Sequence, residues 1–245
     1  MRRCLVGLLC WPLWANADTL LVGVEALNMA PVYRLDARGE YQGFANDLLR
    51  DFAQRSGHEL QIRPWPVARL YQEFFAGRID LKFPDSPLWE EAQRTQLQIA
   101  YSAPVLAYLD GIMRLSPAAH QHTPGKPFRV GVIRGFSSVD FLYAAERYTL
   151  VRASSLEQLY RLLAKGRVDG IFFNALSINY QLRHDAKLLK QPLHLDQHLP
   201  YLQGHYRLSS IQRPDVIAEF DQYLIEHAAQ VAQLKRKWGM PSTLP

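Results

Sequence analysis

The sequence predicts an α/β fold of two similar lobes, because one helix–glycine–strand segment occurs twice. Residues 70–80 (LYQEFFAGRID) and 159–169 (LYRLLAKGRVD) align without a gap. Each copy has apolar residues at helical spacing, a glycine where the helix must end, and a short apolar strand. A strand-like Val-Gly-Val precedes each copy, at residues 22–24 and 130–132. Two such lobes leave a cleft between them; chance recurrence of the segment is the alternative.

The other elements continue the alternation of strands and helices. The pattern predicts strands at 20–24, 59–63, 81–83, 106–115 and 170–173, and helices at 45–56, 90–95, 139–147, 175–183 and 211–238. Such alternation predicts a mixed, mostly parallel sheet in each lobe. Ligands bind at the carboxyl ends of such strands, where helix N-termini also point. The strand ends expected to face the cleft are residues 25–29, 84–86, 134–137 and 174.

The N-terminal residues have the layout of a secretory signal peptide. Two arginines precede an apolar run over residues 4–14, and Ala15-Asn16-Ala17 forms an A-x-A cleavage site. Cleavage after Ala17, leaving residues 1–17 as the signal peptide, predicts a periplasmic protein. The residues before Cys10 are leucines, which argues against lipid attachment there. Because Cys4 and Cys10 both lie in this segment, the mature chain is expected to contain no disulfide and no thiolate metal site.

Composition and motifs favour a binding protein. The formal net charge is +5, and the basic residues are scattered apart from Lys235-Arg236-Lys237, so no nucleic-acid-binding stripe is expected. The chain contains no HExxH, G-x-S-x-G, phosphate-loop or G-x-G-x-x-G motif. We therefore expect no metal, no cofactor and no catalytic residue, in a monomer that binds a small molecule.

Several segments resemble, in order, bacterial extracellular solute-binding proteins of family 3, which have the type II periplasmic-binding-protein fold. These segments are Val22-Gly23-Val24 near Ala30-Pro31, residues 43–49, residues 77–80, Arg94 followed by Tyr101-Ser102-Ala103-Pro104, residues 129–132, residues 166–169 and Lys237-Trp238-Gly239. The resemblance implies two lobes joined by two crossing strands, near 104–107 and 195–199, with ligand captured by hinge closure. It places residues 18–105 and 198–245 in lobe 1 and residues 106–197 in lobe 2.

The resemblance also implies two anchors for a ligand. In amino-acid-binding members, an arginine before the Tyr-Ser-x-Pro run pairs with the ligand carboxylate, and Arg94 stands there; a solvated helix arginine is the alternative. Five residues after the Asp of the second repeat, those members carry an aspartate for the ligand ammonium, but this chain has Asn174. An amide supplies no negative charge, so a ligand without an ammonium group is expected unless Asp85, Glu25 or Asp47 compensates.

Further candidates come from loops and strand ends. The loop of Arg134, Phe136 and Ser137 stands at a helix N-terminus, where backbone N–H groups favour an anionic oxygen. Trp65, beside Arg69, is expected either to wall the pocket or to lie in the core. The complete set of expected ligand-binding residues is Glu25, Trp65, Arg69, Asp85, Ser86, Arg94, Arg134, Phe136, Ser137 and Asn174.

Together these features predict a periplasmic protein that captures an amino-acid-like solute or a small carboxylate for an ABC importer. One alternative is an enzyme resembling the cyclohexadienyl dehydratase of the same fold, with Glu25 or Asp85 as a carboxyl acid of raised pKa. The other is a binding component that reports to a membrane sensor. The expected partner is accordingly a transporter permease or a membrane sensor, and no nucleic acid.

Overall fold

The computed structural model describes residues 18–115, 126–136, 139, 142, 146–184 and 192–240. The expected signal peptide (1–17), Ser137 and most of the helix expected at 139–147 therefore lie outside the described residues. None of the helices in the described ranges is long and apolar enough to cross a membrane.

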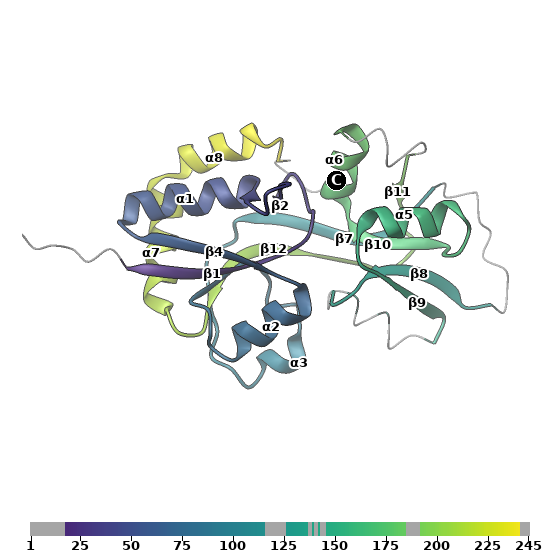
Figure 1. Cartoon of the computed structure of the whole chain (residues 1–245), viewed down its shortest axis with the longest axis horizontal. Helices are drawn as coiled ribbons and strands as arrows, with labels where there is room; N and C mark the ends of the chain where they lie inside the picture. The colour runs from purple at the N-terminus through teal and green to yellow at the C-terminus, as the bar shows by residue number, and fades with distance from the viewer. Residues whose placement is uncertain are drawn as a thin grey trace, which may run out of the picture.

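The elements alternate largely as the sequence predicts, although the strands found at 148–153 and 201–210 were not predicted (Figure 1). The strands are β1 (Thr19–Glu25), β2 (Arg34–Leu35), β3 (Tyr41–Gln42), β4 (Glu59–Trp65), β5 (Leu81–Asp85), β6 (Ala100–Tyr101), β7 (Leu106–Arg114), β8 (Phe128–Ile133), β9 (Tyr148–Ala153), β10 (Gly170–Asn174), β11 (His194–Leu195) and β12 (Tyr201–Ser210). The helices are α1 (Phe44–Ser56), α2 (Val67–Phe75), α3 (Glu91–Arg94), α5 (Leu156–Ala164), α6 (Ala175–His184), α7 (Pro214–Glu226) and α8 (Ala228–Lys237).

The main sheet is continuous through the molecule, in the order β4-β1-β5-β12-β7-β10-β8-β9. Strands β4, β1 and β5 are parallel, and with the helices and loops packed on them they form what we call the first half. Strands β10, β8 and β9 are parallel, and with α5, α6 and their loops they form the second half. The prediction of one separate sheet for each lobe is therefore wrong. Strand β12 pairs with both β5 and β7, and so joins the two parallel parts into one mixed sheet.

The long antiparallel pair of β7 and β12 runs between the two halves. Tyr201–Tyr206 of β12 pairs with Leu106–Gly111 of β7. The first crossing lies close to the expected 104–107. The second lies later in the chain than the expected 195–199, because residues 194–195 form β11 and pair with the far end of β7.

The repeated segment builds the same structure twice. Gly77 and Gly166 end helices α2 and α5 with φ of 65° and 64°, a left-handed conformation that glycine adopts without steric cost. Asp80 then accepts a hydrogen bond from the backbone N–H of Leu21 at 2.7 Å. Asp169 accepts the equivalent bond from Arg129 at 2.8 Å. Each repeat thus fixes its helix and strand to the neighbouring Val-Gly-Val strand.

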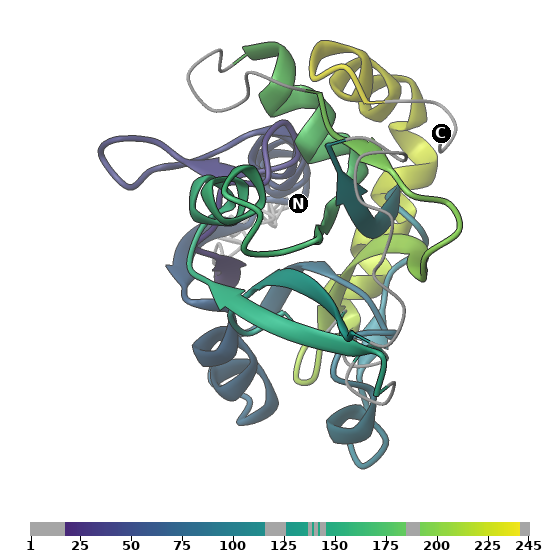
Figure 2. The same ribbon diagram turned by 90° about the vertical axis from the view of Figure 1, so that its right-hand side faces the viewer.

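Helices cover both faces of the first half of the sheet. Helices α1 and α8 lie on one side and α2 on the other (Figures 1 and 2). The prediction of a single C-terminal helix over 211–238 is wrong, because the helix is interrupted at His227, which has a φ of −113°. Pro214 does begin α7, as expected, and the break lets both α7 and α8 pack against α1.

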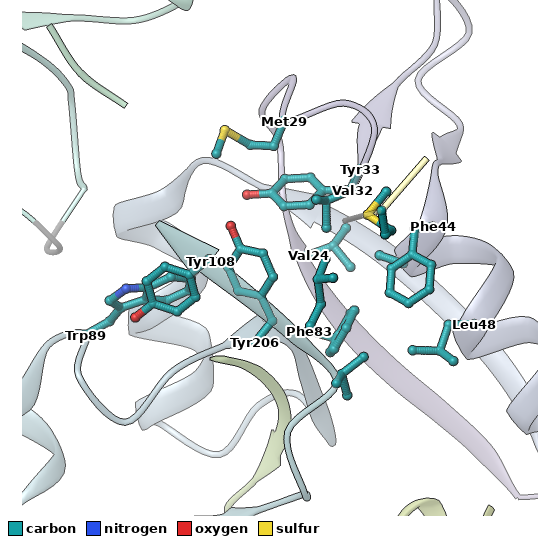
Figure 3. Packing of buried hydrophobic residues seen from close by; sticks show 14 of the residues in the cluster. Val24, Met29, Val32, Tyr33, Phe44, Leu48, Phe83, Trp89, Tyr108 and Tyr206 are labelled. Carbon is teal, nitrogen blue, oxygen red and sulfur yellow. The ribbon is translucent and has the colours of Figure 1, made fainter. Parts of the chain in front are cut away.

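The apolar core follows the sheet through both halves. Val24, Phe44, Leu48 and Phe83 are almost completely buried in the first half (Figure 3). The same cluster extends through Tyr108 and Tyr206, on the connecting strands, to second-half residues such as Ile171. This continuity places the aromatic residues of β7 and β12 at the centre of the molecule, beside the carboxyl end of β1.

Candidate functional site

A small, partly open cavity lies between the two halves of the molecule. Its walls come from β1, the loop after it, α2, the loop after β5, β7, the loop after β8, and β12. The lining residues are Glu25, Met29, Tyr33, Val67, Tyr71, Trp89, Asp110, Phe136 and Tyr206. The cavity volume is about 20 Å³, which is space for about one water molecule. A larger solute therefore requires the walls to move apart.

Glu25 is at the carboxyl end of β1, where the sequence predicted a binding residue. Its side chain is buried and accepts a hydrogen bond from the hydroxyl of Tyr33. Burial raises the pKa of Glu25, and the positive charge of Lys82 partly opposes that rise. Figure 3 shows the hydroxyl groups of Tyr33 and Tyr206 pointing toward the same space beside Met29. Glu25 therefore stands in a polar pocket surrounded by aromatic rings.

Asp110 is a second carboxyl group in the wall, and the sequence reasoning missed it. It lies in β7, is 4% exposed, and accepts a hydrogen bond from the amide of Asn174 at 2.8 Å. Burial raises the pKa of Asp110 to about 7, the hydrogen bond from Asn174 opposes that rise, and the Glu25 charge adds to it. Its signal in the sequence is a single acidic residue within the otherwise apolar run 105–113.

Asn174 has two partners in the structure. Its side-chain oxygen accepts a hydrogen bond from the backbone N–H of Ser177 at 3.0 Å, and so caps α6. Its side-chain nitrogen donates to Asp110 and, at 3.3 Å, to the hydroxyl of Tyr206. Asn174 thus brings no charge of its own but contacts the carboxyl group of Asp110, an acid that the sequence analysis did not name as a possible compensation.

Arg94 and Asp85 contact each other instead of the cavity. Both side chains are buried, and the guanidinium group of Arg94 donates to both oxygens of Asp85, at 2.7 and 3.0 Å. Arg94 also donates to Tyr101 and to the backbone carbonyl of Trp89. The structure thus gives Arg94 a partner inside the chain, and neither Arg94 nor Asp85 lines the cavity. The alternative of a solvated helix arginine is wrong, because Arg94 is buried; the role of ligand anchor stays a prediction.

Lys82 completes this buried ion cluster. Its ammonium group is completely buried and donates to Asp85 at 3.0 Å and to the carbonyl oxygen of Pro84 at 2.9 Å. It also lies 4.7 Å from the ring centre of Tyr71 and 5.4 Å from that of Trp89. The two cations lower the pKa of Asp85 against the effect of its burial. Asp85 is therefore held ionised by Lys82 and Arg94.

The remaining candidates divide between the wall and other places. Phe136 lines the cavity, stacked near Phe173 with ring centres 6.3 Å apart. Ser86 is buried and bonds to the hydroxyl of Tyr108 at 3.0 Å, outside the lining. Three further candidates are absent from the lining of the cavity. The ring of Trp65 packs against the guanidinium group of Arg63. Arg69 pairs with Glu73, and Arg134 is exposed.

Hydrogen bonds join the two halves beside the cavity. The hydroxyl of Ser177 in α6 donates to the carbonyl oxygen of Met29 at 3.0 Å, and the amide of Gln181 donates to that of Asn28 at 3.2 Å. On another side, Gly135 lies against the first turn of α2, where a Cβ would stand 3.1 Å from the backbone nitrogen of Ala68. These contacts join segments of the two halves that carry lining residues of the cavity. Within the described ranges, no group of acidic, histidine or cysteine side chains is arranged to hold a metal ion.

Sequence comparison identifies the family. Residues 20–241 match the bacterial extracellular solute-binding proteins, family 3. The chain belongs to this family. The resemblance seen in the separate segments is thereby confirmed over nearly the whole chain. No curated protein sequence matches it significantly.

Solved structures confirm the fold that the family implies. A histidine kinase sensor domain with similarity to periplasmic binding proteins matches with a TM-score of 0.73 at 22% identity, over 91% of this chain and 96% of that one. A histidine-bound substrate-binding protein of an ABC uptake transporter from Streptococcus pneumoniae has a TM-score of 0.72 at 15% identity, over 90% and 92%. An ancestral amino-acid-binding protein, a precursor of cyclohexadienyl dehydratase, matches with a TM-score of 0.70 at 16% identity, over 90% of this chain and 95% of that one.

Proposed function

We propose that this protein captures a small polar solute in the periplasm and presents its solute-bound form to a membrane partner. The observation that carries the proposal is the small cavity between the halves, whose polar groups come from β1 on one side and from the connecting strand β7 on the other. A solute that contacts Glu25 and Phe136 at once would hold the two halves together. Family membership supports the same function.

The sheet suggests how capture would occur. Only the antiparallel strands β7 and β12 continue between the parallel parts of the sheet within the described residues. We propose that residues 18–105 with 198–245 form one lobe, that 106–197 form the other, and that they move about these strands. The contacts of α6 with the loop after β1 would open and re-form. Such hinge closure is a common response of two-lobed proteins to ligand.

The partner is an importer permease or a membrane sensor, and the matched structures offer a precedent for each. Both would contact the surface that closure creates. We propose export by the signal peptide, cleavage after Ala17 and a monomeric mature protein.

Native mass spectrometry of the protein purified from the periplasm tests capture directly. We expect a mature mass beginning at Asp18 and an additional small molecule that dissociates on activation. Small-angle scattering should then show a larger radius of gyration after that molecule is removed. A protein that carries no solute, and whose melting temperature no member of a metabolite library raises, would contradict the proposal, because a ligand of the folded state alone must raise it.

An enzyme is the second candidate, and Asp110 is the observation that favours it. A buried carboxyl group with a pKa of about 7 suits general acid–base catalysis. The matched precursor of a dehydratase shows that this fold is structurally close to such an enzyme's ancestor. Incubation with a cyclohexadienyl carboxylate, followed by ultraviolet absorbance of an aromatic product, separates the candidates. A binding protein should produce no aromatic product.

A further inference from the structure

The ionisable side chains in the cavity wall all belong to acids and tyrosines. Among the described residues that line the cavity, Glu25 and Asp110 are carboxyl groups, and no lysine, arginine or histidine is present. Both carboxyl groups are almost completely buried. A charged group that enters this space loses most of its hydration, so its partner in the wall largely decides whether it can bind.

The two cations nearby share one carboxylate, so their cluster keeps one net positive charge, and Lys82 acts on Glu25 from outside the lining. Lys82 and Arg94 both pair with Asp85, and neither lies in the lining of the cavity. The ring of Tyr71 belongs to the wall, and both cations lie over it, at 4.7 and 5.7 Å from its centre. A ligand carboxylate in the cavity would therefore meet Glu25 and Asp110 without a cation in the described wall to receive it. Like charges in such contact oppose binding by several kcal/mol.

The rest of the wall is rich in aromatic rings. Tyr33, Tyr71, Trp89, Phe136 and Tyr206 all line the cavity. Trp89 packs edge-on against Tyr206, with ring centres 5.8 Å apart, and Tyr206 stacks on Tyr108 at 4.8 Å. These contacts hold the rings in place. Aromatic faces attract ammonium groups, and walls of this kind recognise organic cations in other proteins.

We infer that the solute is an organic ammonium ion without a carboxylate, held by Glu25, Asp110 and the aromatic wall. This rests on the proposed function and narrows its solute class. The two anchors of an α-amino acid are both altered here: Arg94 pairs with Asp85, and the carboxyl group lies on Asp110, with Asn174 as its hydrogen-bond donor. An amine retains its attraction to the wall when its carboxylate is absent, whereas an amino acid would bring a carboxylate that finds no partner.

Matched pairs of compounds test this inference by titration calorimetry on dialysed protein at pH 7.5. The pairs are cadaverine with lysine, agmatine with arginine, and choline with glycine betaine, which differ chiefly in the carboxylate. We expect at least one amine to bind, and to bind at least tenfold more tightly than its carboxylated partner. Asp110→Asn should weaken that binding at least tenfold, and Asp215→Asn, which removes an exposed charge on α7, should leave it unchanged.

Glu25→Gln is a second variant with the same expectation, in case Asp110→Asn does not fold. The inference is overturned if the carboxylated compounds bind as tightly as the amines, if neither variant weakens binding, or if none of the six compounds binds. Tight binding of a carboxylate solute would overturn this inference and leave solute capture intact. Solute capture itself fails only if the native mass spectrum and the wider library also show no ligand.

Discussion

The two repeats end their strands with different residues at the same position. Asp85 stands five residues after Asp80, and Asn174 stands five residues after Asp169. Asp85 is enclosed by Lys82 and Arg94 in an ion cluster outside the cavity wall. Asn174 caps α6 and donates to Asp110 in the cavity wall.

The difference shows that the same backbone structure accepts either a charged or an uncharged residue at the end of its strand. In the first repeat the carboxylate of Asp85 is stabilised because Lys82 and Arg94 form ion pairs with it. In the second, the amide can both accept from Ser177 and donate to Asp110, and a carboxylate could do only the first. The same position therefore belongs to a buried ion cluster in one repeat and contacts the cavity wall in the other.

The largest effect is expected from breaking the ion cluster of the first repeat. Arg94→Ala leaves Asp85 buried with only Lys82, and we expect the free energy of unfolding to fall by about 3–5 kcal/mol. Urea unfolding followed by circular dichroism measures it. Arg213→Ala removes a more accessible arginine, paired with Asp18 and Asp215, and should cost about 1 kcal/mol or less. A small loss of stability together with lost solute binding would return Arg94 to the role of ligand anchor.

The second effect concerns the acid that Asn174 contacts. Glu25 on β1, Tyr206 on β12 and Asn174 on β10 face Asp110, and its pKa of about 7 lies above the unfolded value of about 3.9. The folded state therefore holds a proton that the unfolded state releases. This stability is fully present below pH 4 and is lost as pH rises toward 7, by at most about 4 kcal/mol.

Unfolding in urea at several pH values between 4 and 8 measures that loss. Asp110→Asn should remove it, so the difference in unfolding free energy between the two proteins should change with pH in the stated direction. Glu25, whose pKa is also raised, remains in both proteins. Because its charge acts on Asp110, the difference between the two pH curves also contains the coupling of the two acids. Parallel pH curves for the wild type and the variant would contradict the assignment to Asp110.

A smaller effect is expected when the second repeat is given the residue of the first. Asn174→Asp places two carboxyl groups in contact, and we expect a loss of about 1–3 kcal/mol at pH 8. The loss should be smaller at pH 5, where the pair can share a proton. Asn174→Ser is the comparison variant: it keeps an oxygen to cap α6 and adds no charge. Because it also removes the bond that lowers the pKa of Asp110, its cost should rise from pH 5 to pH 8, but less steeply than that of Asn174→Asp.

The smallest effects are expected at the Asp residues that end the repeated segments. Asp80→Asn and Asp169→Asn each weaken a hydrogen bond from a strand N–H to a carboxylate, and we expect about 1 kcal/mol from each. Asp169 also pairs with the partly exposed guanidinium group of Arg129, which should add less than about 1 kcal/mol. Thermal unfolding of the two variants compares them. A much larger loss for one repeat would show that the two Asp residues contribute differently to the free energy of unfolding despite their matching positions.

The sequence predicted the repeats and most helix and strand positions because these depend on local chemistry. Helix α1 is expected at 45–56 and found at Phe44–Ser56, since its apolar spacing and Gly57 mark its face and its end. Glu25 and Phe136 were found as wall residues because strand ends in such a fold point to one edge. Asp110 was missed, because it lies in the middle of a connecting strand and not at a strand end.

By itself, the sequence determined the family, the order of elements and the repeated helix–strand unit, since spacing and glycine positions fix these locally. Tertiary structure decided which charged and polar side chains become neighbours. Whether Arg94 meets a ligand or Asp85, and whether Asn174 lacks a negative charge or contacts one, depends on which side chains converge in space from β5, β7 and β10. Buried charges interact over a few ångströms, and residues 64 positions apart, such as Asp110 and Asn174, become neighbours only after folding.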